Sequence, residues 1–169
     1  GKTLTGAQGS VRASAKALLD EVAPAIGTSA GSLNPIATTP SQSGGHNVRY
    51  QQEYRGIPVF GGEVTVQLDA AGATRSLVSD VSADPADDIT PAIPAGDAAA
   101  AAVAATAKAH PAHGDLSAAA PKLWIYDPAV IDAPGLPGAR LVWRTEVTGT
   151  GGEPIREVVL VDADSGGIA

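Results

Sequence analysis

Strict alternation of side-chain type along two neighbouring stretches is the feature that most constrains how this chain can fold. In Asn47–Arg55, Val48, Tyr50, Gln52 and Tyr54 fall on one face, and arginine, glutamine and glutamate residues fall on the other. A period of two residues is typical of a half-buried β-strand. The second alternating stretch covers residues 62–69, and its apolar positions are Val64, Val66 and Leu68. The sequence therefore predicts two neighbouring strands that share a buried face.

Two helices are predicted from a different spacing. Apolar residues recur at helical intervals within Ala7–Ala23, and Pro24 follows directly. A second, alanine-rich helix is predicted from residue 98 to about 110, with Asp97 as its N-cap and Pro111 as its end. Three strands are predicted after each helix, over residues 47–55, 62–69 and 73–81, and over residues 122–126, 139–148 and 155–163.

This order of elements predicts an α+β fold of two tandem αβββ units, each a helix packed on an antiparallel sheet. The expected boundaries are a first domain over residues 1–81, a linker over residues 82–96 and a second domain over residues 97–169. Residues 27–45 are rich in Gly, Ser, Thr and Pro and predict a loop, with at most a short edge strand near Ile36.

Two details of the second domain are also predicted from side-chain pattern. Val158–Val161 is apolar on both faces, which indicates a central or covered strand. Trp143 shares a strand face with Leu141, Thr145 and Val147, so we expect it in the core of that domain.

Composition excludes several classes of function. The chain of 169 residues has a net charge of −7, whereas a nucleic-acid-binding protein needs a basic face. No apolar run reaches the length of a membrane span, and the charge disfavours anionic lipid, so we expect neither nucleic acid nor membrane as a partner. The absence of cysteine excludes disulfides and thiolate metal sites.

A search for reactive side chains yields no catalytic set. There is no HExxH, no GxSxG, no Walker A sequence and no GxGxxG after a strand. His110 and His113 have the spacing of a metal pair, but Pro111 separates them and Asp115 is the one nearby carboxylate in sequence, which favours two solvated loop histidines. Asp84, Asp87 and Asp88 lack the spacing of a calcium loop. We therefore predict no catalytic, cofactor-binding or metal-binding residues, and no cofactor.

The segment from His46 to Leu77 resembles the fungalysin/thermolysin propeptide domain. The hallmark of that family is a Q-x-Y-x-G-x-P-V-x-G-G run, then an alternating strand and a D-x-x-G turn. The matching residues here are Gln52, Tyr54, Gly56, Pro58, Val59, Gly61, Gly62, Asp69 and Gly72. The second half is similar to the PepSY domain that follows in such propeptides, on the basis of its alanine-rich helix, Leu141–Arg144 and Val159–Gly166.

The resemblance implies the pro-region of a secreted zinc metalloprotease of the thermolysin class, with no enzyme activity of its own. Its partner would be the cognate catalytic domain, which it would help to fold and would inhibit. Because that domain would follow the chain in a precursor, the expected protease-contact segment is Asp162, Ala163, Asp164, Ser165, Gly166, Gly167, Ile168 and Ala169. The implied location is secreted, with a signal peptide already removed, and the Ala, Gly and Pro usage favours a bacterial source of high GC content.

A second interpretation remains open at this point. The same two domains would also suit a secreted, non-enzymatic binding module that acts on an unrelated protein or on peptidoglycan. A catalytic domain with HExxH downstream would favour the protease pro-region, and a stop codon there would favour the binding module. An enzyme in its own right is the third alternative, and no group of residues supports it.

Overall fold

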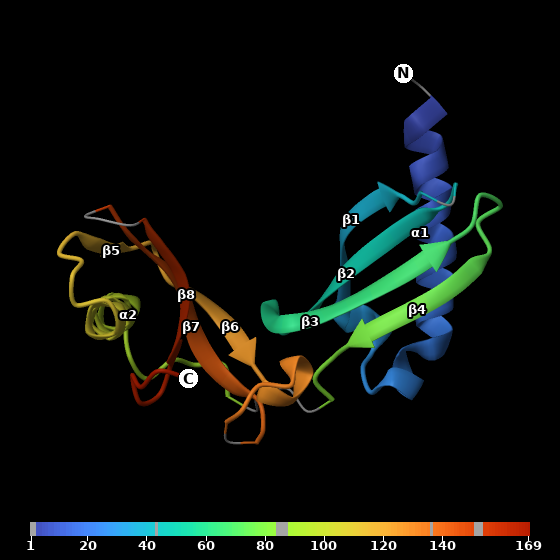
Figure 1. The fold of residues 1–169 in the computed structure, drawn as a ribbon. Coiled ribbons are helices and arrows are strands. Elements are labelled where there is room, and N and C mark those ends of the chain that lie inside the picture. Colours follow the sequence, from blue (N-terminus) through green and yellow to red (C-terminus); the bar gives the residue numbers. More distant parts are fainter. Residues whose placement is uncertain (1–2, 43, 84–87, 136, 151–153) are drawn as a thin grey trace. The chain divides into compact units, whose positions relative to one another are not determined.

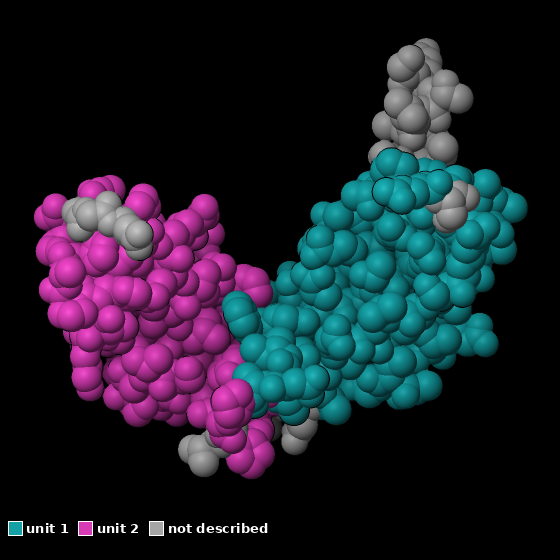
Figure 2. All heavy atoms as spheres, viewed as in Figure 1, with its two compact units in different colours: residues 1–84, 129–133 teal, residues 85–128, 134–169 magenta. Residues whose placement is uncertain are grey.

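The computed structural model describes residues 3–42, 44–83, 88–135, 137–150 and 154–169, with side chains from residue 10 onwards. The chain divides into two compact units (Figure 2). Unit 1 comprises residues 1–84 and 129–133, and unit 2 comprises residues 85–128 and 134–169. The division is not strictly sequential, because residues 129–133 group with unit 1.

Unit 1 is a helix packed on a four-stranded antiparallel sheet (Figure 1). The strands follow one another in space as they do in sequence, β1-β2-β3-β4. A turn in the 3₁₀ conformation, Ala23–Ile26, follows the helix and ends at Gly27, which has φ +82°. The elements are α1 (Thr3–Val22), β1 (Leu33–Pro40), β2 (His46–Tyr54), β3 (Ile57–Leu68) and β4 (Thr74–Asp80).

The core of unit 1 forms where one stripe of α1 meets the alternating face of the central strands. Val11, Ala15 and Leu19 lie one turn apart and are buried, as helical spacing requires. They pack with the alternating residues of β2 and β3, which confirms the face predicted from sequence. The fully buried strand residues in this cluster are Val48, Val64, Val66 and Leu68.

Strand β1 occupies much of the loop predicted over residues 27–45 and is longer than the short edge strand expected near Ile36. Seven of its eight residues pair with β2, and the register shifts between Pro35 and Ala37. Proline donates no backbone hydrogen bond, so it is tolerated in strands only at edges and bulges, and β1 is the edge of this sheet. The sequence signal was weak because polar and proline residues suit an exposed edge strand and a loop equally well.

Unit 2 is again a helix on an antiparallel sheet, built around strand β7. One edge of β7 pairs with β8, and the other edge pairs with β6 and then β5, which lie end to end. Between these two short strands, the Ala119 amide donates to the Glu146 carbonyl of β7 (2.8 Å). The elements are α2 (Ala95–Ala109), β5 (Leu116–Ala118), β6 (Lys122–Tyr126), β7 (Arg140–Gly149) and β8 (Ile155–Asp162), with a 3₁₀ turn at Pro128–Ile131 between β6 and β7.

The α+β class is confirmed, whereas the three-strand count is wrong, because each unit has four strands within the described residues. Asp97 is not the N-cap of α2: Pro94 occupies that position, and Asp97 lies in the first turn, where its charge favours the helix N-terminus. The Thr74–Asp80 and Lys122–Tyr126 strands lie within the ranges predicted for them, residues 73–81 and 122–126.

Two predictions about the sheet of unit 2 need correction. Strand β8 pairs with β7 alone among the named strands of the described chain, and Val158 is 47% exposed, so β8 is an edge strand rather than a covered one. Trp143 packs at the margin of the core and is only partly buried, with its indole N–H donated to the Ile93 carbonyl (3.0 Å). An apolar run indicates that a segment is hydrophobic, but it does not predict whether both edges of the strand pair with neighbouring strands.

The 82–96 segment has structured ends. Ser82 is buried in unit 1, and the amides of Ala92 and Ile93 both donate to the Ala163 carbonyl in unit 2. Residues 84–87 lie outside the described part of the chain. No helix within the described residues is both long and apolar enough to cross a membrane.

Candidate functional site

The residues of the family-type run gather at one end of the β2–β3 hairpin. Arg55 and Gly56 form its turn, both with positive φ (50° and 80°), and Tyr54 pairs with Ile57 across it. Positive φ at both central residues is the mark of a type I′ turn, which matches the twist of the flanking strands. Ile57 and Pro58 already lie in β3. The Arg55 guanidinium lies over the Tyr54 ring, with its central carbon 5.0 Å from the ring centroid.

Just beyond the turn, β3 makes a wide bulge. Gln51 pairs with Glu63 and Glu53 pairs with Pro58, so residues 59–62 all lie opposite the single residue Gln52. Val59 at the start of this bulge is fully buried. The glycine pair Gly61–Gly62 of the family-type run therefore lies within a β-bulge.

Both glycines of the bulge are required by space or backbone geometry. A Cβ atom on Gly62 would lie 2.7 Å from the Cβ of Val59, which is too close, and 3.1 Å from the Gln52 side-chain oxygen, which is a tight contact. Gly61 has φ +74°, and a Cβ there would meet the Ile131 side chain. A side chain at either position would therefore strain the bulge.

The side chain of Gln51 stabilises the bulge through hydrogen bonds to its backbone. The Gln51 amide nitrogen donates to the carbonyls of Val59 (2.7 Å) and Gly62 (2.9 Å), the two ends of the bulge. Gln51 was missed by the sequence analysis because a surface position in an alternating strand gives no sign that its amide turns back to the main chain. The bulge carbonyls, which lose their ladder partners in such an irregularity, thus gain new donors.

Gln52 makes a second set of bonds, toward the end of unit 1. Its side-chain oxygen accepts from the Ser82 amide (2.9 Å), and its nitrogen donates to the Ser82 carbonyl (2.8 Å) and to Thr28 Oγ1 (3.0 Å). Gln52 is only 3% exposed, so these bonds satisfy a buried polar group. The side chain pins the residue that starts the predicted linker to the sheet of unit 1.

The other end of β3 carries the D-x-x-G turn. The Gly72 amide donates to the Asp69 carbonyl (3.0 Å), and Gly72 has φ +85°. Asp69 Oδ1 accepts from the amides of Ala71 and Ala73, both at 2.9 Å. The predicted hairpin turn is therefore confirmed, and its two marker residues serve the backbone.

The expected protease-contact segment in unit 2 is a compact turn. Asp162 Oδ1 accepts from the amides of Asp164 (3.0 Å) and Ser165 (2.8 Å) and from Ser165 Oγ (2.9 Å). Ile168 then forms an antiparallel bridge with Val161, and the Ala169 amide donates to the Leu160 carbonyl (3.0 Å). Residues 162–169 therefore fold back beside β8.

Electrostatics favour the ionised form of Asp162. Partial burial opposes ionisation, but the hydrogen bonds from Ser165 and Asp164 and the charge of Arg140 outweigh it, so the pKa of Asp162 lies below its usual 3.8. Ile168 is 55% exposed and is the large apolar side chain of this turn.

His110 has a partner that the sequence analysis did not foresee. Its Nε2 lies 2.7 Å from Oε1 of Glu157 on β8, and its ring meets that of His113 edge to face at 6.0 Å. The expectation that Asp115 is the one carboxylate near these histidines is therefore wrong, because sheet pairing brings Glu157 close from far along the chain. The His110 side chain is nevertheless 36% exposed. Among the described residues no three His, Cys, Asp or Glu side chains are grouped to hold a metal ion.

Comparison with known proteins identifies part of unit 1. The family profile described as "Fungalysin/Thermolysin Propeptide Motif" matches residues 32–81. A solved structure described as "Bacillus megaterium YpeB C-terminal domain" is similar with a TM-score of 0.42 and 13% identity, over 81% of this chain. The chain spans 54% of the length of that structure. No curated protein sequence matches the chain. Residues 32–81, from the start of β1 to just after β4, thus carry a fungalysin/thermolysin propeptide motif.

Proposed function

We propose that this chain is the pro-region of a secreted thermolysin-like metalloprotease, which helps the catalytic domain to fold and inhibits it until the two are separated. The observation that carries the proposal is the propeptide motif over residues 32–81. The proposed division keeps a propeptide-like domain over residues 1–81, a linker over 82–96 and a PepSY-like domain over 97–169.

The geometry of the motif indicates what its residues do. Gln52, Val59 and Gly62 are buried, and their contacts are with unit 1 itself. They serve to build the hairpin, and the enzyme would therefore dock on a surface outside the buried part of the motif. A preformed sheet can lower the folding barrier of a large protease by stabilising a partly folded state, and it inhibits when it stays docked.

The proposed contact with the enzyme is the Asp162–Ala169 turn. Its backbone is already fixed by hydrogen bonds within the chain, so little conformational entropy would be lost on binding. Ile168 offers an exposed apolar side chain beside this fixed backbone. A docked surface of standard size buries roughly 1,600 Å² in total, so we expect other parts of the chain to contribute as well.

Inhibition by the separate chain is the direct test. Purified chain is mixed with the mature cognate enzyme, and peptide hydrolysis is followed as the chain is titrated. Ile168→Asp should weaken inhibition at least about tenfold, since it places a charge in an apolar contact. Val78→Asp is the matched control, because Val78 is 61% exposed on β4 of unit 1 and should leave inhibition unchanged.

Two results would contradict parts of the proposal. Full enzyme activity at micromolar excess of the chain, with no complex on a sizing column, would favour the binding-module alternative instead. Equal inhibition by the Ile168→Asp variant and the parent chain would remove the turn from the interface and leave the pro-region role intact. Recovery of activity by denatured enzyme, measured with and without added chain, tests the folding role separately.

A further inference from the structure

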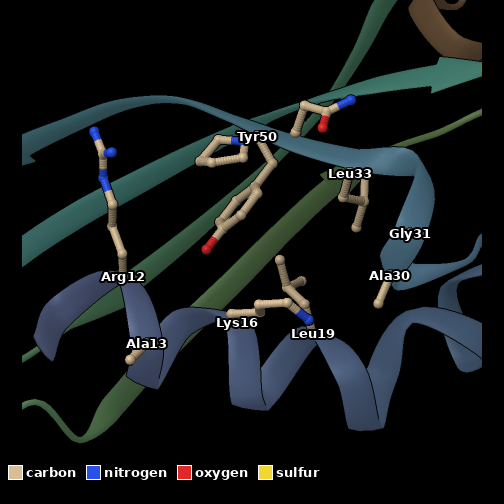
Figure 3. A pocket seen from close by; sticks show the side chains of 10 residues that line it. Arg12, Ala13, Lys16, Leu19, Ala30, Gly31, Leu33 and Tyr50 are labelled. Carbon is tan, nitrogen blue, oxygen red and sulfur yellow. The ribbon is translucent and has the colours of Figure 1, made fainter. Parts of the chain in front are cut away.

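Unit 1 contains a pocket that neither the propeptide motif nor the proposed docking turn uses. It has a volume of about 420 Å³ and lies between α1 and the start of β1 (Figure 3). Leu19, Leu33 and Ala30 form its apolar wall. Small-ligand sites have volumes of roughly 300–1,000 Å³ and are lined mainly by apolar groups with a few polar ones. The pocket has both properties.

The polar groups of the pocket have one chemical character. The Tyr50 ring extends from β2 toward α1, with its hydroxyl pointing to the side from which Arg12 and Lys16 emerge (Figure 3). Tyr50 is only 3% exposed as a whole residue, yet it lines the pocket. Its hydroxyl is not among the buried polar atoms that lack a hydrogen-bond partner in the described residues, so it is open to the pocket and can donate to a ligand there.

The Tyr50 hydroxyl can donate a hydrogen bond to an anion only while it stays protonated. Burial raises the pKa of its phenol above the usual 10.0; the charge of Arg12 opposes this rise and that of Asp20 adds to it. The hydroxyl therefore keeps its proton at neutral pH.

The two cations beside it are available at the pocket mouth. Arg12 uses Nε to bond Thr38 Oγ1 (3.0 Å), which holds the guanidinium in place. Lys16 pairs with Asp20 across one helical turn at 2.6 Å, but both side chains are more than half exposed, so that pair is weak. In a chain of net charge −7, two cationic residues that line the same pocket as the phenol favour an anionic group at this place.

An extended peptide is a poor fit to the same surface. Adding a strand to β1 requires backbone donors along its free edge, and Pro35 and Pro40 have none. The irregularity between Pro35 and Ala37 further disturbs the register that strand addition needs. A compact ligand with one charged head avoids both obstacles.

We infer that this pocket binds a small amphiphilic carboxylate, with its apolar chain against Leu19, Leu33 and Ala30 and its carboxylate at the Tyr50 hydroxyl between Arg12 and Lys16. Neither the protease nor the docking turn enters the inference, so it is tested independently of the proposed function.

Decanoate is the probe, titrated into the full chain by calorimetry, with amide shifts of Gly31 in the pocket wall as a second readout. We expect one saturable site. Decanol, which lacks the charge, and decyltrimethylammonium, which reverses it, should each bind at least about tenfold more weakly, because the charge-assisted hydrogen bond is lost.

Substitutions locate the site. Tyr50→Phe keeps the ring and removes only the donor, so the dissociation constant for decanoate should rise about tenfold. Arg12→Gln and Lys16→Gln should each raise it about two- to fivefold, as expected for exposed charges. Ala13→Phe, at an exposed position that lines the pocket, should abolish binding by filling it. Arg75→Gln on β4 removes an exposed cation elsewhere in unit 1 and is the control that should change nothing.

Three outcomes would overturn the inference. The first is the absence of saturable binding at millimolar decanoate in a chain with normal thermal unfolding. The second is equal binding of decanol and decanoate, or equal binding by the Tyr50→Phe variant. The third is unchanged decanoate binding by the Ala13→Phe variant, which would place the bound decanoate outside this pocket.

Discussion

The two helices each cover one face of an antiparallel sheet, but they do so with very different side chains. On α1, Val11, Ala15 and Leu19 are buried against the sheet of unit 1. On α2, the buried residues are Ala98, Ala102 and Thr106, none larger than threonine. Both helices cover an antiparallel sheet, but α1 contributes branched side chains to its core, whereas α2 contributes mainly methyl groups.

The difference shows how a helix with little apolar area can still be held. Small residues let the axis of α2 approach the sheet, but each buries little surface, and hydrophobic stabilisation scales with that surface. Larger groups from outside the helix complete the packing of unit 2, among them Ile93, Leu116 and Trp143. Unit 1 thus depends on its helix for core volume, and unit 2 depends on its sheet and flanking segments.

The largest effect should come from the side chain that has no counterpart on α2. Leu19 is 1% exposed, so Leu19→Ala should lower the free energy of unfolding of unit 1 by about 3 kcal/mol through lost burial and a cavity. Ala98→Gly on α2 should cost about 1 kcal/mol, mostly through helix propensity. Amide hydrogen exchange, read in the strands of each unit, measures both. Equal losses would show that the helices contribute alike.

Next in size is the tryptophan of unit 2. Trp143→Ala should cost about 2 kcal/mol, less than the 3–5 kcal/mol of a fully buried tryptophan, because Trp143 lies at the core margin. Trp143→Phe should recover most of the packing but lose the bond to the Ile93 carbonyl, about 1 kcal/mol. Urea unfolding of both variants is the measurement. An unchanged unfolding midpoint for Trp143→Ala would contradict the idea that Trp143 supplies the core packing that the small side chains of α2 do not.

A smaller effect is expected where unit 1 relies on hydrogen bonds. Gln52→Leu leaves the buried amide and carbonyl of Ser82 without partners and should cost about 1.5 kcal/mol. Gln51→Leu is a near-neighbour control that should loosen the bulge without exposing Ser82. Exchange of the Ser82 amide should therefore accelerate in the first variant alone. Similar acceleration of Ser82 exchange in both variants would mean that the Gln51 and Gln52 hydrogen bonds do not act independently.

The smallest effect belongs to the turn after β8. Because the folded pKa of Asp162 is lowered, its ionised form stabilises unit 2 above the unfolded pKa near 3.8, and this contribution is lost as pH falls through the folded value. Solvent screening keeps it small, about 0.5 kcal/mol. Asp162→Asn should thus differ from the parent chain in thermal unfolding at neutral pH, and the two should converge in strong acid. A difference that persists or grows in acid would contradict this sign.

Much of the fold follows from local pattern. The β2 and β3 faces, the Asp69 turn, and the existence of both helices were predicted, because burial of one face imposes a period that the sequence must carry. Strand β1 was foreseen only as a short edge strand near Ile36, because it is polar and contains prolines, and β5, which is only three residues long, was not predicted. Neither carries enough alternation to stand out from a loop.

By itself, the sequence determined the chemistry of each segment: which residues alternate, where glycine permits a positive φ, and which reactive motifs are absent. Tertiary structure alone decided which distant groups meet. Gln52 reaches Ser82 thirty positions away, Glu157 on β8 meets His110, and Tyr50 of β2 lines one pocket with residues of α1. The physical reason is that a pattern along the chain reports the burial of one element, whereas a hydrogen bond or a pocket depends on the register and approach of two.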